Sequence, residues 1–323
     1  MSHIFICVRQ PGGLRYIEKL VKKNTNKVIL AAPKNILNLS QELDCLKIED
    51  VECSQNSLLD LNNRFKIDKL LTSVCYREEK SFNFEKECLK FFKKKKIKTL
   101  QFFDTSYDFK KKLIQTNGNH IFPDSFLFID NKSLLDFKKE IKNNFEYHIV
   151  GHPVFEDIQL LQYKFDKSSI AFINQPIRYD IGNRLNFDEK FVWNELKVIL
   201  KKNNNNIKSI FYKPHPREKI QKKQNDNKLL INNLNKFNGI IVGMFSSLMI
   251  ELFLKGKYVI SLQPSKLSNF CYLSSRNFIK KVNCAEDLIQ TANLFNKNEN
   301  LLKVKKLKEV FSKSTYRLEK ALN

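Results

Sequence analysis

Short apolar runs alternate with longer amphipathic segments along the first half of the chain. The short runs are rich in β-branched and aromatic residues, which favours buried strands. They span residues 4–8, 28–32, 69–75, 99–103, 125–129 and 147–150. The segments 14–23, 84–95 and 134–143 instead place apolar side chains at helical spacing. This alternation predicts βαβ units and a parallel sheet.

The same pattern starts again in the second half. Strands are predicted over residues 169–174, 209–213, 239–244 and 258–262, and helical structure over 188–201, 246–254, 287–295 and 302–322. The boundary between the halves falls within residues 151–167. The sequence therefore predicts an α/β protein with two Rossmann-like, doubly wound domains, 1–160 and 161–323, that face a central cleft. In such sheets, ligands bind at the C-terminal ends of the strands.

Length and charge are consistent with two domains and an anionic partner. The chain has 323 residues, enough for two domains of roughly 150 residues each. Its 57 Lys and Arg against 34 Asp and Glu give a net charge of +23, which favours phosphate-bearing substrates or an acidic membrane surface. Runs such as Lys93–Lys96 and Asn203–Asn206 also indicate a general compositional bias. No arginine-rich cluster interleaved with aromatic residues is present, so nucleic acid is not an expected partner.

Several further patterns bear on compartment and chemistry. Seven Cys, with no CxxC pair, fit reduced thiols in the cytoplasm better than disulfides or a zinc site. No apolar run reaches the ~18 residues of a membrane span. We therefore expect a cytoplasmic protein, peripheral on the inner face of the cell membrane. The absence of P-loop, GxSxG, HExxH and Asp-x-Asp patterns predicts no cofactor and no metal.

The strongest candidate for chemistry is the segment Lys213-Pro214-His215-Pro216-Arg217 at the end of a predicted strand. Its two prolines restrict the backbone on both sides of the imidazole. A rigidly placed His can bind a phosphate oxygen or act as a general acid near neutral pH. Lys213 and Arg217 add fixed positive charge. The alternative is a turn whose imidazole bonds only to nearby backbone groups.

A second candidate is the pair Ser246-Ser247 at the start of a predicted helix. Serine hydroxyls beside the free N–H groups of a helix N-terminus can form a phosphate site. Glu251, four residues after Ser247, could accept a hydrogen bond from a ribose hydroxyl. Gln175, after the first strand of the second half, could reach the nucleotide. The alternative is plain helix capping with a solvent-facing Glu.

The first half offers two weaker candidates. Gly12 and Gly13 lie between the first strand and a helix, where glycine permits close approach of a ligand to the backbone; an ordinary tight turn is the alternative. Asp104 directly follows an apolar strand. It is a candidate general base for an acceptor hydroxyl, and a helix N-cap is the equally supported alternative.

Together, the His-Pro segment and the Ser-Ser pair resemble the HP and SS motifs of bacterial GT-B sialyltransferases and polysialyltransferases. The similarity covers about residues 168–265 and extends to teichoic-acid polymerases. It implies that His215 contacts the donor phosphate or protonates the leaving group, and that Ser246 and Ser247 bind the phosphate of a CMP-sugar. The acidic motif that supplies the base in that family has no intact copy here, and Asp104 is the best-placed carboxylate.

These residues lead to one functional hypothesis and three alternatives. The hypothesis is an inverting, metal-independent glycosyltransferase that moves a sugar from a nucleotide-sugar donor to a glycan or glycolipid acceptor of the cell surface, in capsule or lipopolysaccharide biosynthesis. The first alternative is a polyol-phosphate transferase using a CDP-alcohol. The second is a nucleotide-sugar epimerase of the same fold. The third is a basic binding module at a membrane surface, without enzymatic activity.

Overall fold

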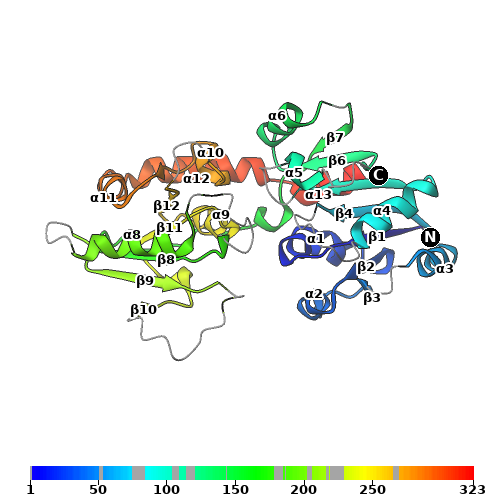
Figure 1. The fold of residues 1–323 in the computed structure, drawn as a ribbon, viewed down its shortest axis with the longest axis horizontal. Coiled ribbons are helices and arrows are strands. Elements are labelled where there is room, and N and C mark those ends of the chain that lie inside the picture. Colours follow the sequence, from blue (N-terminus) through cyan, green and yellow to red (C-terminus); the bar gives the residue numbers. More distant parts are fainter. Residues whose placement is uncertain are drawn as a thin grey trace. The chain divides into compact units, whose positions relative to one another are not determined.

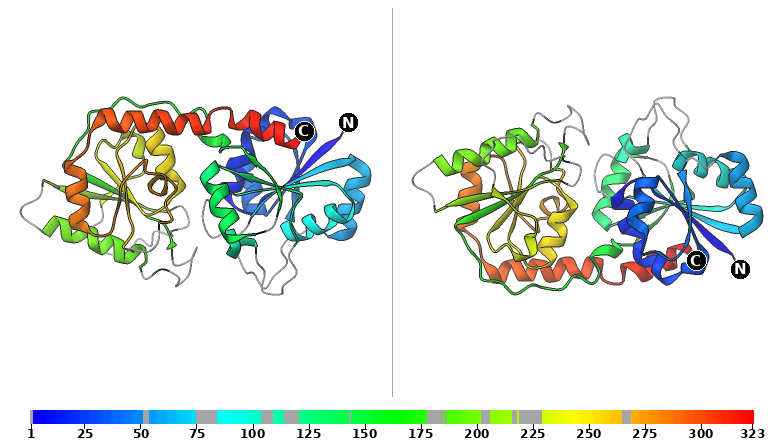
Figure 2. Two further views of the ribbon diagram at one scale, coloured as in Figure 1. Left: turned by 90° about the horizontal axis from the view of Figure 1, so that it is seen from above. Right: turned by 90° about the horizontal axis from the view of Figure 1, so that it is seen from below.

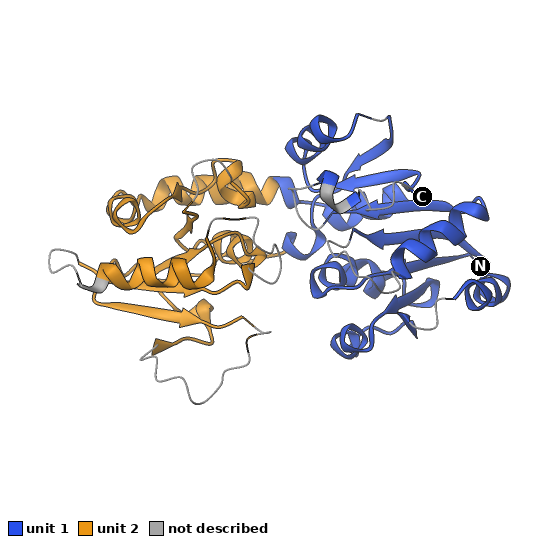
Figure 3. Ribbon diagram, in the orientation of Figure 1, with its two compact units in different colours: residues 1–156, 310–323 blue, residues 157–309 orange. Residues whose placement is uncertain are grey.

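The structure is a computed structural model and divides into two compact units. It describes residues 2–50, 54–74, 84–103, 109–113, 121–142, 144–177, 185, 187–201, 206–215, 218, 229–264 and 269–323. Unit 1 comprises residues 1–156 and 310–323, and unit 2 comprises residues 157–309 (Figure 3). The assignment of an acceptor domain to 1–160 and a donor domain to 161–323 stays a prediction about function.

Unit 1 is built on a seven-stranded sheet with the order β3-β2-β1-β4-β5-β6-β7 (Figure 1). All of its strand pairs are parallel. Its strands are β1 (His3–Cys7), β2 (Val28–Ala32), β3 (Leu46–Glu49), β4 (Ile67–Ser73), β5 (Lys98–Phe102), β6 (Ser125–Phe128) and β7 (Glu146–Ile149).

Helices cover both faces of this sheet (Figure 2). Along β1, Ile6 belongs to one buried cluster and Phe5 and Cys7 to another, because successive side chains point to opposite faces. The first cluster includes residues of α1 (Pro11–Lys23), α2 (Lys34–Leu37) and α13 (Ser314–Leu322), and the second includes residues of α3 (Gln55–Phe65) and α4 (Phe84–Lys94). Two buried faces explain why the strands are continuous apolar runs. The short helices α5 (Phe109–Leu113) and α6 (Asn131–Glu140) pack on a third cluster, rich in phenylalanine.

Unit 2 repeats the architecture with a six-stranded parallel sheet of order β10-β9-β8-β11-β12-β13. Its strands are β8 (Ser169–Ile173), β9 (Ser209–Lys213), β10 (Leu229–Leu230), β11 (Ile240–Gly243), β12 (Val259–Leu262) and β13 (Lys281–Val282). Its helices are α8 (Glu189–Lys201), α9 (Ser247–Leu254), α10 (Tyr272–Ser275), α11 (Ala285–Asn293) and α12 (Lys297–Phe311). The last two residues of α12, from Val310 on, belong to unit 1. Trp193 of α8 stacks on Phe172 of β8 with 5.9 Å between ring centroids and fixes this helix on the sheet.

The predicted α/β architecture with parallel sheets is confirmed, and helical structure is confirmed over most of residues 302–322. Residues 302–322 do not form one continuous helix, because Lys313 adopts the left-handed conformation, with φ of 56°, between α12 and α13. A left-handed residue ends the run of helical hydrogen bonds. The strand β3 and the helix α3 had no counterpart in the sequence prediction.

Two further observations concern cysteine and membrane spans. The cysteines at positions 7, 45, 88, 271 and 284 are free thiols. Among the described helices, none combines the length and the apolar character needed to cross a bilayer.

Candidate functional site

The centre of the sheet in unit 2 is a topological switch point. Strand β8 pairs with β9 on one side and with β11 on the other. The chain continues from β8 to β9 and β10 in one direction, whereas β11 leads to β12 and β13 in the opposite direction. Diverging connections leave a crevice at the C-terminal ends of the central strands. The segments that follow β8, β9 and β11 begin at Asn174, Pro214 and Met244, and they contain most of the predicted donor residues.

The turn after β11 leads directly into the N-terminus of α9. Ser246 is the N-cap, and its Oγ accepts a hydrogen bond from the Leu248 N–H at 3.3 Å. Ser247 is the first helical residue and is exposed. A Cβ on Gly243 would lie 2.7 Å from Met249 Sδ, so a larger residue there would displace the Met249 side chain of α9. The dipole and the N–H groups of a helix N-terminus favour a phosphate at this position.

The segment after β9 brings His215 to the same edge of the sheet. Lys213 is the last residue of β9, and both Lys213 and His215 are half-buried. The Lys213 carbonyl accepts a hydrogen bond from the Asn174 N–H at 3.0 Å. This bond extends the pairing of β8 and β9 by one step and places His215 next to the end of the central strand. Pro216 and Arg217 lie outside the described residues.

Glu218 bonds to the segment of residues 213–215, which we call the His215 loop. One of its carboxylate oxygens accepts from Asn174 Nδ2 at 2.8 Å and from the His215 backbone N–H at 3.3 Å. The Tyr212 hydroxyl donates to the same carboxylate at 2.9 and 3.0 Å. The Glu218 N–H in turn donates to the His215 carbonyl at 2.9 Å. The roles of Asn174 and Glu218 could not be predicted from the sequence, because their contact joins residues from two separate strand ends.

Gln175 and Glu251 both have partners within unit 2. Gln175 Oε1 accepts from the Phe245 N–H at 3.3 Å, which links the ends of β8 and β11. Glu251 lies on α9 and forms an ion pair with Lys255 at 2.7 Å. Both side chains of that pair are largely buried, with 20% and 17% exposed. A ribose hydroxyl would therefore compete with Lys255 for the Glu251 carboxylate.

Unit 1 has its own switch point, between β1 and β4. Helix α1 begins there with Pro11, Gly12 and Gly13, and its N-cap residue, Gln10, makes no side-chain capping bond. A Cβ on Gly13 would lie 3.3 Å from Val8 and 3.5 Å from Ser73, so the first turn of α1 approaches the ends of both central strands closely. Asp104, the predicted base, lies outside the described residues.

A buried polar cluster lies at the end of β4. Ser73 Oγ donates to the Glu85 carboxylate, and its carbonyl accepts from Gln101 Nε2 at 3.2 Å. Glu85 and Gln101 are 4% and 8% exposed. These groups bond largely to each other, in contrast to the half-buried His215 and exposed Ser247 of unit 2. Over the described ranges, no group of three or more His, Cys, Asp or Glu residues is arranged to hold a metal ion.

Comparison with known proteins places the fold. No protein-family model matches the chain, and no curated protein sequence matches it. Solved structures do match over the full length. The glycotransferase of kitacinnamycin has a TM-score of 0.62 at 11% identity, covering 100% of this chain and 99% of that chain. MurG of Acinetobacter baumannii has a TM-score of 0.58 at 10% identity, covering 100% and 99%. SsfS6, a Streptomyces glycosyltransferase complexed with thymidine diphosphate, has a TM-score of 0.53 at 8% identity, covering 100% of each chain. The two-domain α/β fold is that of GT-B glycosyltransferases, which confirms the predicted fold class.

Proposed function

We propose that this chain is a glycosyltransferase whose unit 2 binds a nucleotide-sugar donor. The observation that carries the proposal is the sheet edge after β8, β9 and β11, where the His215 loop and the N-terminus of α9 flank one switch point. A helix N-terminus, two serine hydroxyls, a lysine and an imidazole are groups suited to a diphosphate or phosphate ester. The GT-B fold of the solved relatives, one of them complexed with thymidine diphosphate, supports the same conclusion.

The proposed reaction is an inverting transfer without a metal ion. The acceptor hydroxyl oxygen attacks the anomeric carbon while the bond from that carbon to the donor phosphate oxygen breaks. The nucleotide leaves with the bonding electrons, and its phosphate takes up negative charge. His215 donates a proton to this leaving phosphate, and Lys213, Arg217, Ser246, Ser247 and the α9 N–H groups stabilise its charge. Gln175 and Glu251 contact the nucleotide or its ribose.

The acceptor is proposed to bind unit 1. Asp104 removes the proton from the acceptor hydroxyl, and the first turn of α1 at Gly12 and Gly13 contacts the acceptor. The resemblance of the His-Pro and Ser-Ser segments to sialyltransferases favours a CMP-linked, sialic-acid-like sugar as the donor. A glycan or glycolipid of the cell surface, made in capsule or lipopolysaccharide biosynthesis, is the corresponding acceptor class.

A thermal-shift screen with CMP, CDP, UDP, GDP and dTDP tests the proposal. A ligand that binds only the folded state stabilises it by about 2.7 kcal/mol at a concentration of 100 times its Kd. We expect one of these nucleotides to raise Tm, and the Ser246→Ala/Ser247→Ala double variant to lose most of that shift. If none of the five raises Tm at millimolar concentration, a nucleotide-sugar donor is excluded. Release of free sugar with CMP, rather than glycerol phosphate with CMP, distinguishes a sugar donor from a CDP-alcohol.

Peripheral binding to the inner face of the cell membrane is part of the proposal. It rests on the net charge of +23, because an anionic bilayer attracts basic proteins. We expect cosedimentation with vesicles that contain phosphatidylglycerol, and its loss as salt rises, since exposed charges are screened over ~8 Å at physiological ionic strength. Equal binding to neutral phosphatidylcholine vesicles would show that charge does not direct the association.

A further inference from the structure

Two adjacent residues after the central strand of unit 2 contact both halves of the proposed phosphate site. Strand β8 ends at Ile173, between β9 and β11. Asn174 and Gln175 follow it. Their side chains bond in opposite directions across the sheet, Asn174 toward the His215 loop and Gln175 toward the turn before α9.

The Asn174 side of this arrangement depends on one carboxylate. Glu218 accepts from Asn174 Nδ2 at 2.8 Å, from the Tyr212 hydroxyl at 2.9 Å and from the His215 backbone N–H at 3.3 Å. The three donors come from β8, from β9 and from the loop itself. Asn174 is only 6% exposed, so its bond to Glu218 is shielded from competing water. The backbone at His215 is therefore held relative to the end of β8.

The Gln175 side fixes the turn that precedes α9. Gln175 Oε1 accepts from the Phe245 N–H at 3.3 Å, and the Gln175 carbonyl accepts from the Ile177 N–H at 2.8 Å. Phe245 is 8% exposed and immediately precedes Ser246, the N-cap of α9. A shift of Gln175 would therefore move the start of the helix whose N–H groups face the phosphate.

We infer that Asn174, Gln175 and Glu218 are positioning residues that set the separation between the His215 loop and the N-terminus of α9. The inference rests on the proposed function, because a separation matters only if one ligand contacts both groups. A phosphate that bonds to an imidazole and to helix N–H groups requires both within about 3 Å of its oxygens. Misplacement by about 1 Å can cost on the order of 10²-fold in rate.

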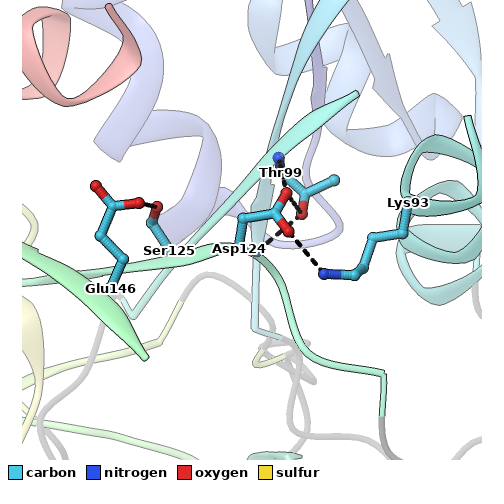
Figure 4. Close-up of polar contacts among 5 residues, drawn as sticks. All are labelled: Lys93, Thr99, Asp124, Ser125 and Glu146. Carbon is cyan, nitrogen blue, oxygen red and sulfur yellow. Dashed lines mark hydrogen bonds and ion pairs between the residues drawn. The ribbon is translucent and has the colours of Figure 1, made fainter. Parts of the chain in front are cut away.

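Unit 1 contains a matched control for Glu218. Asp124 accepts from the Thr99 N–H and Thr99 Oγ1, each at 2.8 Å, and from Lys93 Nζ at 2.7 Å (Figure 4). It too is a carboxylate with three donors. Asp124 immediately precedes β6 and bonds to the second residue of β5, so it lies at the edge of the sheet opposite the strand ends that bind ligands.

The experiment compares Glu218→Gln with Asp124→Asn in the full-length chain. An amide in place of the Glu218 carboxylate keeps the size, but it removes the negative charge and leaves a single acceptor oxygen for the three donors. Nucleotide binding is measured by calorimetry with whichever of CMP, CDP, UDP, GDP and dTDP raises Tm. In parallel, the imidazole signals of the five histidines are followed by NMR as the nucleotide is added, with His215→Ala to assign one of them. Urea unfolding measures the stability of each variant.

We expect Glu218→Gln to raise the nucleotide Kd at least tenfold and to reduce the shift of the His215 signal. Asp124→Asn should lose stability while its Kd stays within twofold of wild type. Combining Glu218→Gln with Asn174→Asp exchanges donor and acceptor across the same contact and should recover part of the affinity. If Glu218→Gln does not fold, Asn174→Ala removes the same contact from the other side and is tested with the same readouts, and a tenfold rise in Kd is again expected.

Two results would overturn the inference, and only the first of them is compatible with the proposed function. If wild type binds a nucleotide and both Glu218→Gln and Asn174→Ala bind it with unchanged Kd and an unchanged His215 signal, the positioning role is wrong and the proposed function stands. If wild type binds none of the five nucleotides, the proposed function fails, and the positioning role fails with it.

Discussion

Each unit contains a His-Pro sequence just beyond the end of a strand, and the two imidazoles lie in opposite environments. His152 follows β7 in unit 1 and is 6% exposed. Its ring packs against Tyr16 and Phe155, with centroid distances of 4.9 and 4.5 Å. His215 follows β9 in unit 2, is half-buried, and lies beside the switch point. The same dipeptide thus belongs to a core in one unit and to a candidate site in the other.

The positions of the two strands account for the difference. Strand β7 is at the edge of its sheet, and α1 and the 3₁₀ turn Pro153–Phe155 pack together over His152. Strand β9 is next to the central strand β8, so its C-terminal end opens on the crevice. Burial, and secondarily the charge of Arg15, lowers the pKa of His152 to about 3. His152 is therefore neutral at physiological pH and unsuited to donate a proton there.

Unit 2 also has the larger excess of positive charge. Unit 2 has 27 Lys and Arg against 13 Asp and Glu, whereas unit 1 has 30 against 21. The larger positive excess of unit 2 favours an anionic nucleotide. The lesson is that motif, sheet position and charge must agree before a His-Pro sequence is assigned to catalysis.

Separate replacements of the two histidines have the largest expected effects and test whether only His215 takes part in catalysis. His215→Ala should lower kcat by about 10²–10⁴-fold, the usual contribution of general acid catalysis, while the fold is retained. His152→Ala should mainly lower stability, because it leaves a cavity beside Tyr16. Both are measured with the donor that the nucleotide screen identifies, together with urea unfolding. A near wild-type kcat for His215→Ala would remove the catalytic distinction between the two sequences.

Single replacements of the two serines test how each one contributes to nucleotide binding by unit 2. Ser247→Ala should raise the nucleotide Kd about tenfold without loss of stability, because the side chain is exposed and a hydrogen bond to a charged group contributes about 1.5–3 kcal/mol. Ser246→Ala should weaken binding similarly and also cost about 1 kcal/mol of stability, since Ser246 caps α9. Calorimetry and urea unfolding measure both quantities. If neither Kd changes, the pair is only a helix cap.

The pH dependence of stability tests the buried state of His152. Its folded-state pKa of about 3 lies below the ordinary value of 6.5. Below pH 6.5 the unfolded chain therefore binds a proton that the folded chain does not, and stability falls as pH decreases toward 3. Between pH 7 and pH 5 this contribution amounts to ~2 kcal/mol. Between pH 7 and pH 5, the His152→Phe variant should therefore lose ~2 kcal/mol less stability than wild type. Urea unfolding of both proteins at both pH values measures this difference. Parallel losses in the two proteins would contradict the buried, neutral imidazole.

Substitutions of two glycines near helix starts, Gly243 and Gly13, have the smallest expected effects. A Cβ on Gly243 would lie 2.7 Å from Met249 Sδ, whereas a Cβ on Gly13 would lie 3.3 Å from Val8. Gly243→Ala should therefore cost about 1–3 kcal/mol through overpacking, and Gly13→Ala less than about 1 kcal/mol. Tm measurements on both variants decide the order. The reverse order would show that α1 approaches its strands more closely than α9 does.

Much of the architecture followed from local patterns. The strands were recognisable because both faces of each sheet are covered, so runs such as Val28–Ala32 and Ser209–Lys213 are apolar or aromatic for most of their length. β3 could not be recognised because its four residues, LKIE, bury only Ile48, and α3 because its sequence, QNSLLDLNNRF, is largely polar and buries only Leu58. The break at Lys313 was missed because a lysine in the left-handed conformation leaves no mark in the sequence.

The local sequence accounts for what depends on neighbours along the chain: the alternation of strand and helix, the serine cap of α9, and the position of the His215 segment at a strand end. The tertiary structure decided what depends on distant contacts. Glu218 acquires its role from Asn174, 44 residues away. The final segment joins unit 1 partly through the bond from Thr315 to Glu156, 159 residues away. Such contacts form only when separate βαβ segments pack together, so no local pattern of residues encodes them.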